Sequence, residues 1–414
     1  MKLNEIGTRA KAAAPKLASL RSKEKNEALL DMGQMLDEMR SEILRANALD
    51  MESASKNGMN QVMQDRLRLT DARIDGMIQG IREVAALEDP VGSFVSTVRR
   101  PNGLIIGRQR VPLGVIGIIY ESRPNVTVDA AALCLKAGNA VILRGGSEAI
   151  NSNIALGRAM RSALSRCGLE DAVQVIEDTS HETAVELMKL TSCLDVLIPR
   201  GSAKLINSVV ENATVPVIET GVGNCHVYVD SSADLDMAAN IVFNAKCSRP
   251  SVCNAQESLL VARSVANEFL PLVKSRLDEK KVEIRGCPET CAILGNFAVP
   301  AADEDFYTEY LDYILSVKIV SDVDEAIAWI NEHGTRHSEA IVTSDYFASQ
   351  KFLREVDAAA VYVNASTRFT DGGEFGLGAE IGISTQKMHA RGPMGVNELT
   401  TTKYIVYGEG QIRV

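Results

Sequence analysis

The first clear pattern in the chain is a helical one near the N-terminus. Between residues 22 and 47, apolar side chains recur at alternating spacings of three and four residues, with charged residues between them. This periodicity predicts a surface helix with one buried face. The apolar positions are Leu29, Met32, Leu36, Met39 and Ile43.

A different pattern, short polar-apolar alternation, covers residues 94–111 and returns at residues 400–414. In the first stretch Asn102-Gly103 separates two alternating runs, which is typical of a β-hairpin. We therefore expect an inserted two-stranded arm. The C-terminal strand would expose an edge, so it should pair with this arm or with another subunit.

Between these segments, short apolar runs alternate with helical stretches. This alternation predicts parallel sheets covered by helices on both faces. Because 414 residues exceed what one core usually supports, we expect two α/β domains. The predicted strands are 115–119, 141–143, 173–176, 195–198 and 215–218, followed by 227–229, 259–261, 317–320 and 361–363.

Composition and charge exclude several classes of protein. The net charge of -10 is spread along the chain, and the absence of a basic stripe argues against nucleic-acid binding. No stretch approaches the roughly 20 apolar residues of a membrane span, and the N-terminus lacks the apolar core of a signal peptide, so we expect a cytoplasmic protein. The eight scattered cysteines are expected to be reduced thiols.

Cys253 is the candidate nucleophile. It lies in a polar loop four residues after Arg249, and a neighbouring cation favours the reactive thiolate. A buried packing cysteine is the alternative, and a cysteine-histidine hydrolase also stays open because the chain has five histidines. Cys287 and Cys291 lack two further ligands for zinc, so we expect no metal.

Glycine-containing turns follow three of the predicted strands. They lie at residues 145–146, 201–202 and 221–224, where free backbone N–H groups can hold an anion at a helix N-terminus, although each can equally be a simple tight turn. The usual G-x-G-x-x-G fingerprint is missing. Arg144 ends a strand where a cation can hold the 2′-phosphate of NADP, unless it is merely a solvated side chain.

These pieces, in this order, resemble the aldehyde dehydrogenase superfamily. The stretches that carry the resemblance are 110–117, 137–144 and the cysteine loop 247–255. Longer motifs are similar to the branch of the superfamily that reduces L-glutamyl 5-phosphate. They are YESRPNVTVD at 120–129, IPRG at 198–201, GNCHVYVD at 223–230, RPSVCN at 249–254, and the segment from 363–373 through 389–395.

The resemblance implies an aldehyde dehydrogenase-like α/β fold with a β oligomerisation arm. Residues 1–93 and 111–226 would bind NADPH, residues 227–394 would form the catalytic domain, and residues 94–110 and 395–414 would form the arm of a dimer or tetramer. It also implies NADPH-dependent reduction of L-glutamyl 5-phosphate to L-glutamate 5-semialdehyde, with release of phosphate, in proline biosynthesis. A glutamate 5-kinase would supply the substrate.

Site residues follow from the matching positions. The resemblance makes Cys253 the nucleophile that forms a thioester, and brings Arg144 and Ser147 to the adenosine end of the cofactor. Gly201 and Ser202 match the turn over the pyrophosphate.

Three further positions bear on the mechanism. Glu309 matches the position that holds the nicotinamide ribose. Arg123 falls where hydrolytic relatives have an oxyanion asparagine, with Asn125 two residues further on. Glu219 is counted among the cofactor-binding positions; hydrolytic relatives keep at this position the base that activates water, and a structural role for it is equally open.

Substrate recognition and two rival functions stay open. Arg123, Arg368 and Asp371 are candidates for the substrate's carboxylate, phosphate and ammonium groups, without an assignment of which binds which. One rival is a hydrolytic NAD(P)-dependent aldehyde dehydrogenase that uses Glu219. The other is a cysteine hydrolase or acyltransferase without nicotinamide.

Overall fold

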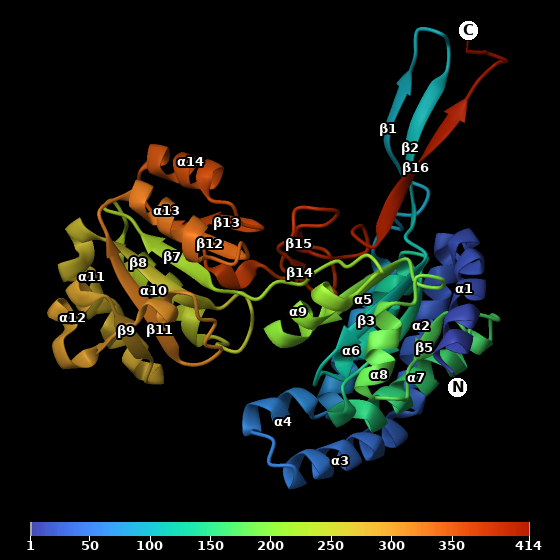
Figure 1. The fold of residues 1–414 in the computed structure, drawn as a ribbon, viewed down its shortest axis with the longest axis horizontal. Helices are drawn as coiled ribbons and strands as arrows, with labels where there is room; N and C mark the ends of the chain where they lie inside the picture. The colour runs from blue at the N-terminus through green and yellow to red at the C-terminus, as the bar shows by residue number, and fades with distance from the viewer. Residues whose placement is uncertain (1, 414) are drawn as a thin grey trace. The chain divides into compact units, whose positions relative to one another are not determined.

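The computed structural model describes residues 2–413, which divide into two compact units (Figure 1). Unit 1 runs up to Thr220 and includes 376–382 and the residues from Met394 onward; unit 2 comprises Gly221–Phe375 and Ile383–Pro393. The border falls six residues before the one expected at 226/227, so that strand β7 (Cys225–Val229) lies wholly in unit 2. The division into a cofactor-binding and a catalytic domain stays a prediction.

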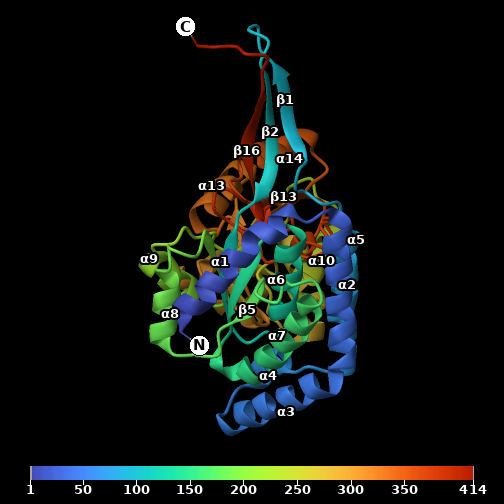
Figure 2. The ribbon, with the colours of Figure 1, turned by 90° about the vertical axis from the view of Figure 1, so that its right-hand side faces the viewer.

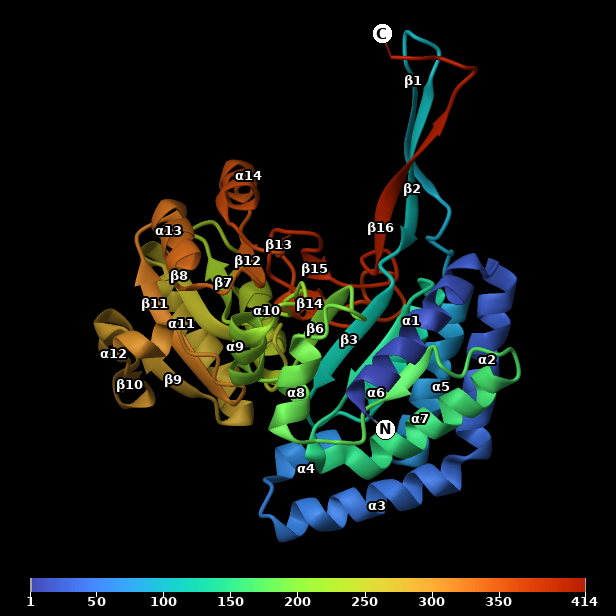
Figure 3. The same ribbon diagram turned by 45° about the vertical axis from the view of Figure 1, so that its right-hand side comes forward.

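The N-terminal helices of unit 1 differ from the single helix expected at 22–47. Met39, with ψ near 9°, ends α2 (Ser22–Glu38) before α3 (Arg40–Lys56) begins. The apolar spacing misses this break because both helices bury residues at helical intervals. α3 also makes a buried polar contact with the helix at 150–165, since Asp50 accepts the backbone N–H of Ser152 at 2.8 Å. The other N-terminal helices are α1 (Leu3–Ser19), α4 (Gln61–Leu67) and α5 (Asp71–Ala86) (Figure 3).

The sheet of unit 1 is parallel, with the strand order β5-β4-β3-β6. Because β6 pairs on the opposite side of β3 from β4, right-handed crossovers place α6 and α7 on one face and α8 and α9 on the other. The strands are β3 (Val115–Tyr120), β4 (Ala140–Arg144), β5 (Val173–Val175) and β6 (Val196–Arg200). The helices are α6 (Asn125–Lys136), α7 (Ile150–Ser165), α8 (His181–Met188) and α9 (Ala203–Asn212).

The prediction of a strand at 215–218 is wrong. Only a single bridge between Leu197 and Val217 forms there. Pro216 has no N–H to donate to a ladder, which limits regular pairing at this position.

The arm belongs to unit 1 and has three antiparallel strands in the order β1-β2-β16 (Figure 2). The strands β1 (Phe94–Arg99) and β2 (Ile105–Pro112) form the predicted hairpin, and the turn between them uses Gly103 with φ 89°. The expected pairing of the C-terminal strand is confirmed, because β16 (Thr400–Tyr407) lies along β2. That strand ends at Tyr407, earlier than predicted.

Unit 2 contains a parallel sheet of seven strands in the order β10-β9-β11-β8-β7-β12-β13. Side chains alternate between two cores: Val227 and Val229 of β7 pack with helices α10 and α11, whereas Tyr228 packs with α13 and α14. The strands after β7 are β8 (Gln256–Ala262), β9 (Glu283–Gly286), β10 (Val299–Pro300), β11 (Ile314–Val320), β12 (Ser338–Val342) and β13 (Ala360–Val363). The helices are α10 (Leu235–Cys247), α11 (Arg263–Leu277), α12 (Pro288–Leu294), α13 (Val323–His333) and α14 (Tyr346–Glu355).

The two parallel sheets and the β arm confirm the predicted α/β fold class. A short antiparallel pair, β14 (Ile383–Ser384) with β15 (Gly392–Pro393), completes the strands named here. In residues 2–413 no helix combines the length and apolar character needed to cross a membrane.

Candidate active site

Residues 248–255, which we call the nucleophile loop, join α10 to β8 in unit 2 and carry the half-buried Cys253. A buried ion pair closes the loop at its two ends: Lys246 Nζ lies 2.6 Å from Glu257 Oε2, and both side chains are fully buried. Burial raises the pKa of Glu257 to about 7 and lowers that of Lys246, in each case against their mutual attraction. The contact joins the last turn of α10 to the start of β8, on either side of the nucleophile loop.

Gly223 lies against the backbone of the nucleophile loop. A Cβ at this position would be 1.4 Å from the carbonyl oxygen of Cys253, so only glycine fits. The same carbonyl accepts a hydrogen bond from the Cys225 thiol at 3.2 Å. Glu309 Oε1 accepts the N–H of Gly223 at 2.7 Å, which ties this glutamate to the surroundings of Cys253. Its predicted role at the nicotinamide ribose stays a prediction.

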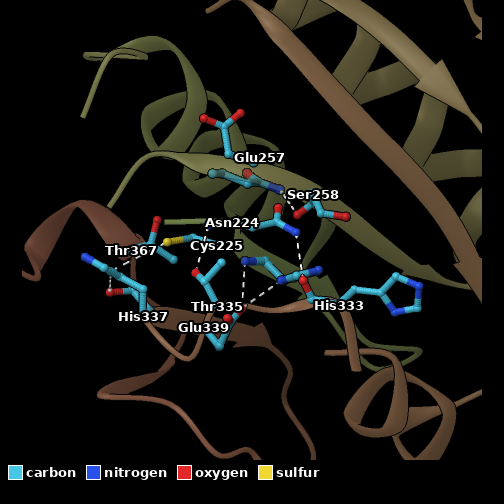
Figure 4. A network of polar contacts seen from close by, with 12 residues as sticks. Asn224, Cys225, Glu257, Ser258, His333, Thr335, His337, Glu339 and Thr367 are labelled. Carbon is cyan, nitrogen blue, oxygen red and sulfur yellow. Dashed lines mark hydrogen bonds and ion pairs between the residues drawn. The ribbon is translucent and has the colours of Figure 1, made fainter. Parts of the chain in front are cut away.

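A buried polar network supports the segment that begins at Gly223 (Figure 4). Asn224 donates its side-chain amide to the carbonyl of His333 at 3.0 Å, and its backbone N–H to Thr335 Oγ1 at 2.9 Å. His226 Nδ1 lies 3.1 Å from Glu339 Oε2. Burial raises the pKa of Glu339, while His226 opposes that rise. These contacts hold the amino ends of β7 and β12 beside the nucleophile loop.

Arg368 is brought to the nucleophile loop by the short helix η5 (Thr367–Phe369). Its Nε donates to Ser248 Oγ at 3.1 Å, and another guanidinium nitrogen donates to Asn254 Oδ1. Burial lowers the pKa of Arg368, and the positive charge of Arg249 lowers it further. Two cations near a half-buried thiol form a suitable environment for an anionic substrate group.

Asp371, the third substrate candidate, already stabilises a turn. Its Oδ1 accepts the N–H of Gly373 at 2.9 Å and that of Glu374 at 3.3 Å. The side chain is exposed, and binding of an ammonium group stays a prediction.

We expect Gly223→Ala to lower kcat by about 100-fold or more, because the new methyl group must displace the Cys253 backbone and a shift of about 1 Å can cost that much. The steady-state rate with purified protein measures this effect. Gly80→Ala in α5 is the control, since nothing lies within 4 Å of the added Cβ there. A Gly223→Ala variant with the wild-type rate would mean that the loop position does not matter to catalysis.

The cofactor candidates gather at the carboxyl edge of the unit 1 sheet. Arg144 ends β4, and Gly201 directly follows β6. In doubly wound α/β sheets, ligands bind at the carboxyl ends of the strands, at the point where the strand order reverses. Arg144 donates to the carbonyl of Thr179 at 2.7 Å, yet its buried Nε has no hydrogen-bond partner. Burial lowers the pKa of this guanidinium. An unsatisfied buried guanidinium N–H fits a phosphate group.

Two of the three predicted anion turns, those at 145–146 and 201–202, lie beside a side-chain carboxylate. Glu121 accepts the backbone N–H of Ser202 at 2.7 Å, at the N-terminus of α9. Glu148 accepts the backbone N–H of Ser122 at 2.6 Å and lies where a Cβ of Gly146 would be. Ser147 is exposed in the same turn. The N–H of Ser202 therefore suits an anion, and a pyrophosphate at α9 requires Glu121 to move.

Three further sequence candidates lie in unit 1. Arg123 is half-buried between β3 and α6, and Asn125 begins α6, where its amide donates to Asp129 Oδ2 at 2.9 Å. Glu219 is half-buried just before the end of this unit at Thr220. Their predicted roles stay predictions. Within the described chain, no group of three or more His, Cys, Asp or Glu side chains has the geometry of a metal site.

Sequence reasoning missed the residues that hold the site together. Asn254, Lys246, Glu257 and Glu121 were not singled out, although Asn254 directly follows the nucleophile. Their partners lie from 11 to 116 positions away along the chain, so no local pattern indicates them.

Comparison with known proteins gives full-length matches. The aldehyde dehydrogenase family matches residues 1–291 and 298–405. The chain is 60% identical to gamma-glutamyl phosphate reductase of Clostridium perfringens (strain 13 / Type A) over 98% of each chain. It is 61% identical to that of Carboxydothermus hydrogenoformans, covering 99% of this chain and 98% of the relative. The crystal structure of the Thermotoga maritima gamma-glutamyl phosphate reductase superposes with a TM-score of 0.97 at 51% identity over 100% of both chains.

The chain therefore belongs to the aldehyde dehydrogenase family. Within that family, its full-length relatives place it in the gamma-glutamyl phosphate reductase branch. This confirms the resemblance found in the motifs between residues 110 and 395.

Proposed function

We propose that this chain reduces L-glutamyl 5-phosphate to L-glutamate 5-semialdehyde with NADPH and releases phosphate, as a step of proline biosynthesis. Full-length similarity to gamma-glutamyl phosphate reductases supports the proposal. The structural observation that carries it is Arg368, whose guanidinium contacts both ends of the loop bearing Cys253. A nucleophilic thiol beside a held cation is suited to acyl transfer from an anionic acyl phosphate.

In the proposed reaction the Cys253 thiolate attacks the carbonyl carbon of the acyl phosphate. The carbon–oxygen bond to phosphate then breaks, and a thioester on Cys253 remains. Reduction of the thioester carbonyl to the aldehyde level requires a hydride, which a nicotinamide cofactor held by Arg144, Ser147, Gly201 and Ser202 would supply. Cys253 leaves as a thiolate. Arg123 and Asn125 are our proposed donors to the carbonyl oxygen, where negative charge develops.

Arg123, Arg368 and Asp371 are the proposed groups for the substrate's charged ends. Among them Arg368 is favoured for phosphate, because a planar guanidinium binds a phosphate through two parallel hydrogen bonds. Its position beside the nucleophile loop suits the leaving group.

Unit 1 is proposed to bind the cofactor through Arg144, Ser147, Gly201 and Ser202, and unit 2 to contribute Cys253 and Glu309. The family implies a nicotinamide cofactor. NADPH is our choice over NADH because the unsatisfied N–H of Arg144 is suited to the 2′-phosphate.

Arg144→Ala should raise the Kd for NADPH by about 10- to 100-fold while changing that for NADH much less, since loss of a charge-assisted hydrogen bond costs about 1.5–3 kcal/mol. Fluorescence titration with each nucleotide measures both constants. Arg158→Ala, an exposed arginine on α7, is the matched control. Equal weakening of both nucleotides would remove the assigned role.

We also propose a homo-oligomer and a cytoplasmic location. The arm exposes a row of apolar side chains, which is unfavourable in an isolated protomer; they are Phe94, Val95, Val98, Tyr404, Val406 and Tyr407. A functional link to glutamate 5-kinase follows from the proposed substrate, because that class of kinase makes the acyl phosphate.

The proposed function is tested in the reverse direction. NADP+ reduction is followed with glutamate 5-semialdehyde, with and without inorganic phosphate. A strict requirement for phosphate is expected, because phosphate must attack the thioester to re-form the acyl phosphate. Equal rates without phosphate would mean that water cleaves the thioester, and would place Glu219 in the role of the base of a hydrolytic enzyme.

A further inference from the structure

Asn254, the residue after the nucleophile, forms hydrogen bonds to residues 368–370 through both the nitrogen and the oxygen of its side-chain amide. Its Nδ2 donates to the carbonyl of Thr370 at 2.9 Å and to that of Arg368 at 3.2 Å. Its Oδ1 accepts from the Arg368 guanidinium. Its backbone carbonyl also accepts from Thr367 Oγ1 at 2.8 Å. The nucleophile loop and residues 367–370 are thus joined through a single residue.

The chemistry of these contacts requires an amide. Asn254 is only 4% exposed, so its donors and acceptor cannot turn to water instead. Two N–H groups meet two carbonyl oxygens while the amide oxygen meets a cation, and among short side chains only asparagine offers that combination. Alanine would leave all three partners without their hydrogen bonds, and aspartate cannot donate to the carbonyls.

The guanidinium held by Asn254 spans the loop that carries Cys253. Arg368 contacts Ser248 at the start of the loop and Asn254 near its end. The charged or titratable groups that act on Arg368 are Arg249, Asp371, Cys253 and Cys225. A cation fixed in this way favours the thiolate form of the enclosed cysteine and can bind an anion beside it.

We propose that Asn254 is a positioning residue: its side chain fixes Arg368 against the nucleophile loop, so that the Cys253 thiolate and the anion-binding guanidinium keep one spacing. This inference rests on the proposed function for the role of Arg368 toward phosphate. Its effect on the thiolate is independent of that function, because it depends only on the distance between two charged groups.

The test uses Asn254→Ala in the full chain. Alkylation of Cys253 by iodoacetamide is followed across a range of pH by mass spectrometry of the modified peptide. We expect the midpoint to rise by about one pH unit and the rate at neutral pH to fall about 10-fold, because a distant guanidinium stabilises the thiolate less. In the reverse reaction, the KM for phosphate should rise about 10-fold while the Kd for NADP+ stays constant.

Asn331→Ala is the matched control, because that amide also binds backbone groups, those of Glu355 and Asp357 in unit 2. It should leave the alkylation profile and the phosphate KM unchanged. If Asn254→Ala does not fold, Asn254→Asp serves, since its carboxylate cannot donate to the carbonyls and neutralises Arg368. It should shift both readouts in the same direction.

A folded Asn254 variant with the wild-type alkylation profile and the wild-type phosphate KM would overturn the inference. Failure of the proposed function is distinguishable from this result. If the wild type shows no phosphate dependence, the function fails, and the alkylation profile still decides the role of Asn254. If the wild type depends on phosphate and the variant matches it, only Asn254 loses its assignment.

Discussion

Cys253→Ala abolishes phosphate-dependent reduction of NADP+: we expect the rate to fall by about 10³-fold or more, as when other covalent nucleophiles are removed. The physical reason is that alanine offers no atom that can form the thioester. Binding of NADPH should persist, because the cofactor candidates Arg144 and Ser202 lie in the other unit. Steady-state rates and a fluorescence titration on the same preparation measure both quantities.

The matched control for this experiment is Cys291→Ala. Cys291 is also half-buried and lies in α12 of unit 2, where its thiol donates to the carbonyl of Gly286 at 3.4 Å. It should retain the wild-type rate. Substantial residual activity of Cys253→Ala would reject covalent catalysis and return the protein to a mechanism in which Cys253 is a packing residue.

Lys246→Met should lower the free energy of unfolding by about 3–5 kcal/mol, the usual cost of removing one partner of a buried ion pair. Glu257 would then be a fully buried carboxyl group without its cation. Urea unfolding can be followed by fluorescence of Trp329, the one tryptophan of the chain, which lies in unit 2 with the ion pair. Lys246→Met/Glu257→Met should recover most of the loss, because an apolar pair replaces the ions.

The loss of unfolding free energy in Lys246→Met should depend on pH, and the direction follows from the pKa of Glu257. Burial already raises the pKa of Glu257 to about 7, above its unfolded value near 4.3, and loss of Lys246 raises it further. A carboxyl group with a raised folded pKa contributes stability below its unfolded pKa and loses it as the pH rises through the folded pKa. Lys246→Met should therefore be less destabilised at pH 5 than at pH 8.

A pH-independent loss would show that Glu257 does not change protonation in the variant, contrary to this expectation. Arg263→Met is the control for a surface pair. Arg263 and Glu289 are also 2.6 Å apart, but their side chains are 57% and 47% exposed. Water screens such a pair, so its removal should leave the unfolding midpoint nearly unchanged.

The local pattern of residues along the chain was enough to predict the fold class, the hairpin of the arm and the family. Alternation of apolar runs with helical stretches specified two parallel sheets, because hydrophobic periodicity decides which face of each element is buried. The Asn102-Gly103 turn specified the hairpin of the arm. Motifs spread from residue 110 to residue 395 specified the family, since they keep their order along the chain.

Hydrophobic periodicity did not predict every helix and strand correctly. The break at Met39 escaped it because the apolar spacing continues from α2 into α3. The apolar run at 215–218 satisfied the strand pattern, yet a proline in it limits pairing to one bridge.

Only the tertiary structure decided how the site is held. Asn254 meets Arg368, Gly223 meets Cys253, and Lys246 meets Glu257 through contacts made when strands and loops pack side by side. Such contacts depend on which strands neighbour each other and on which loops share an edge of the sheet. Spacing along one chain cannot encode that adjacency, because it arises from the burial of the whole core rather than from any local preference.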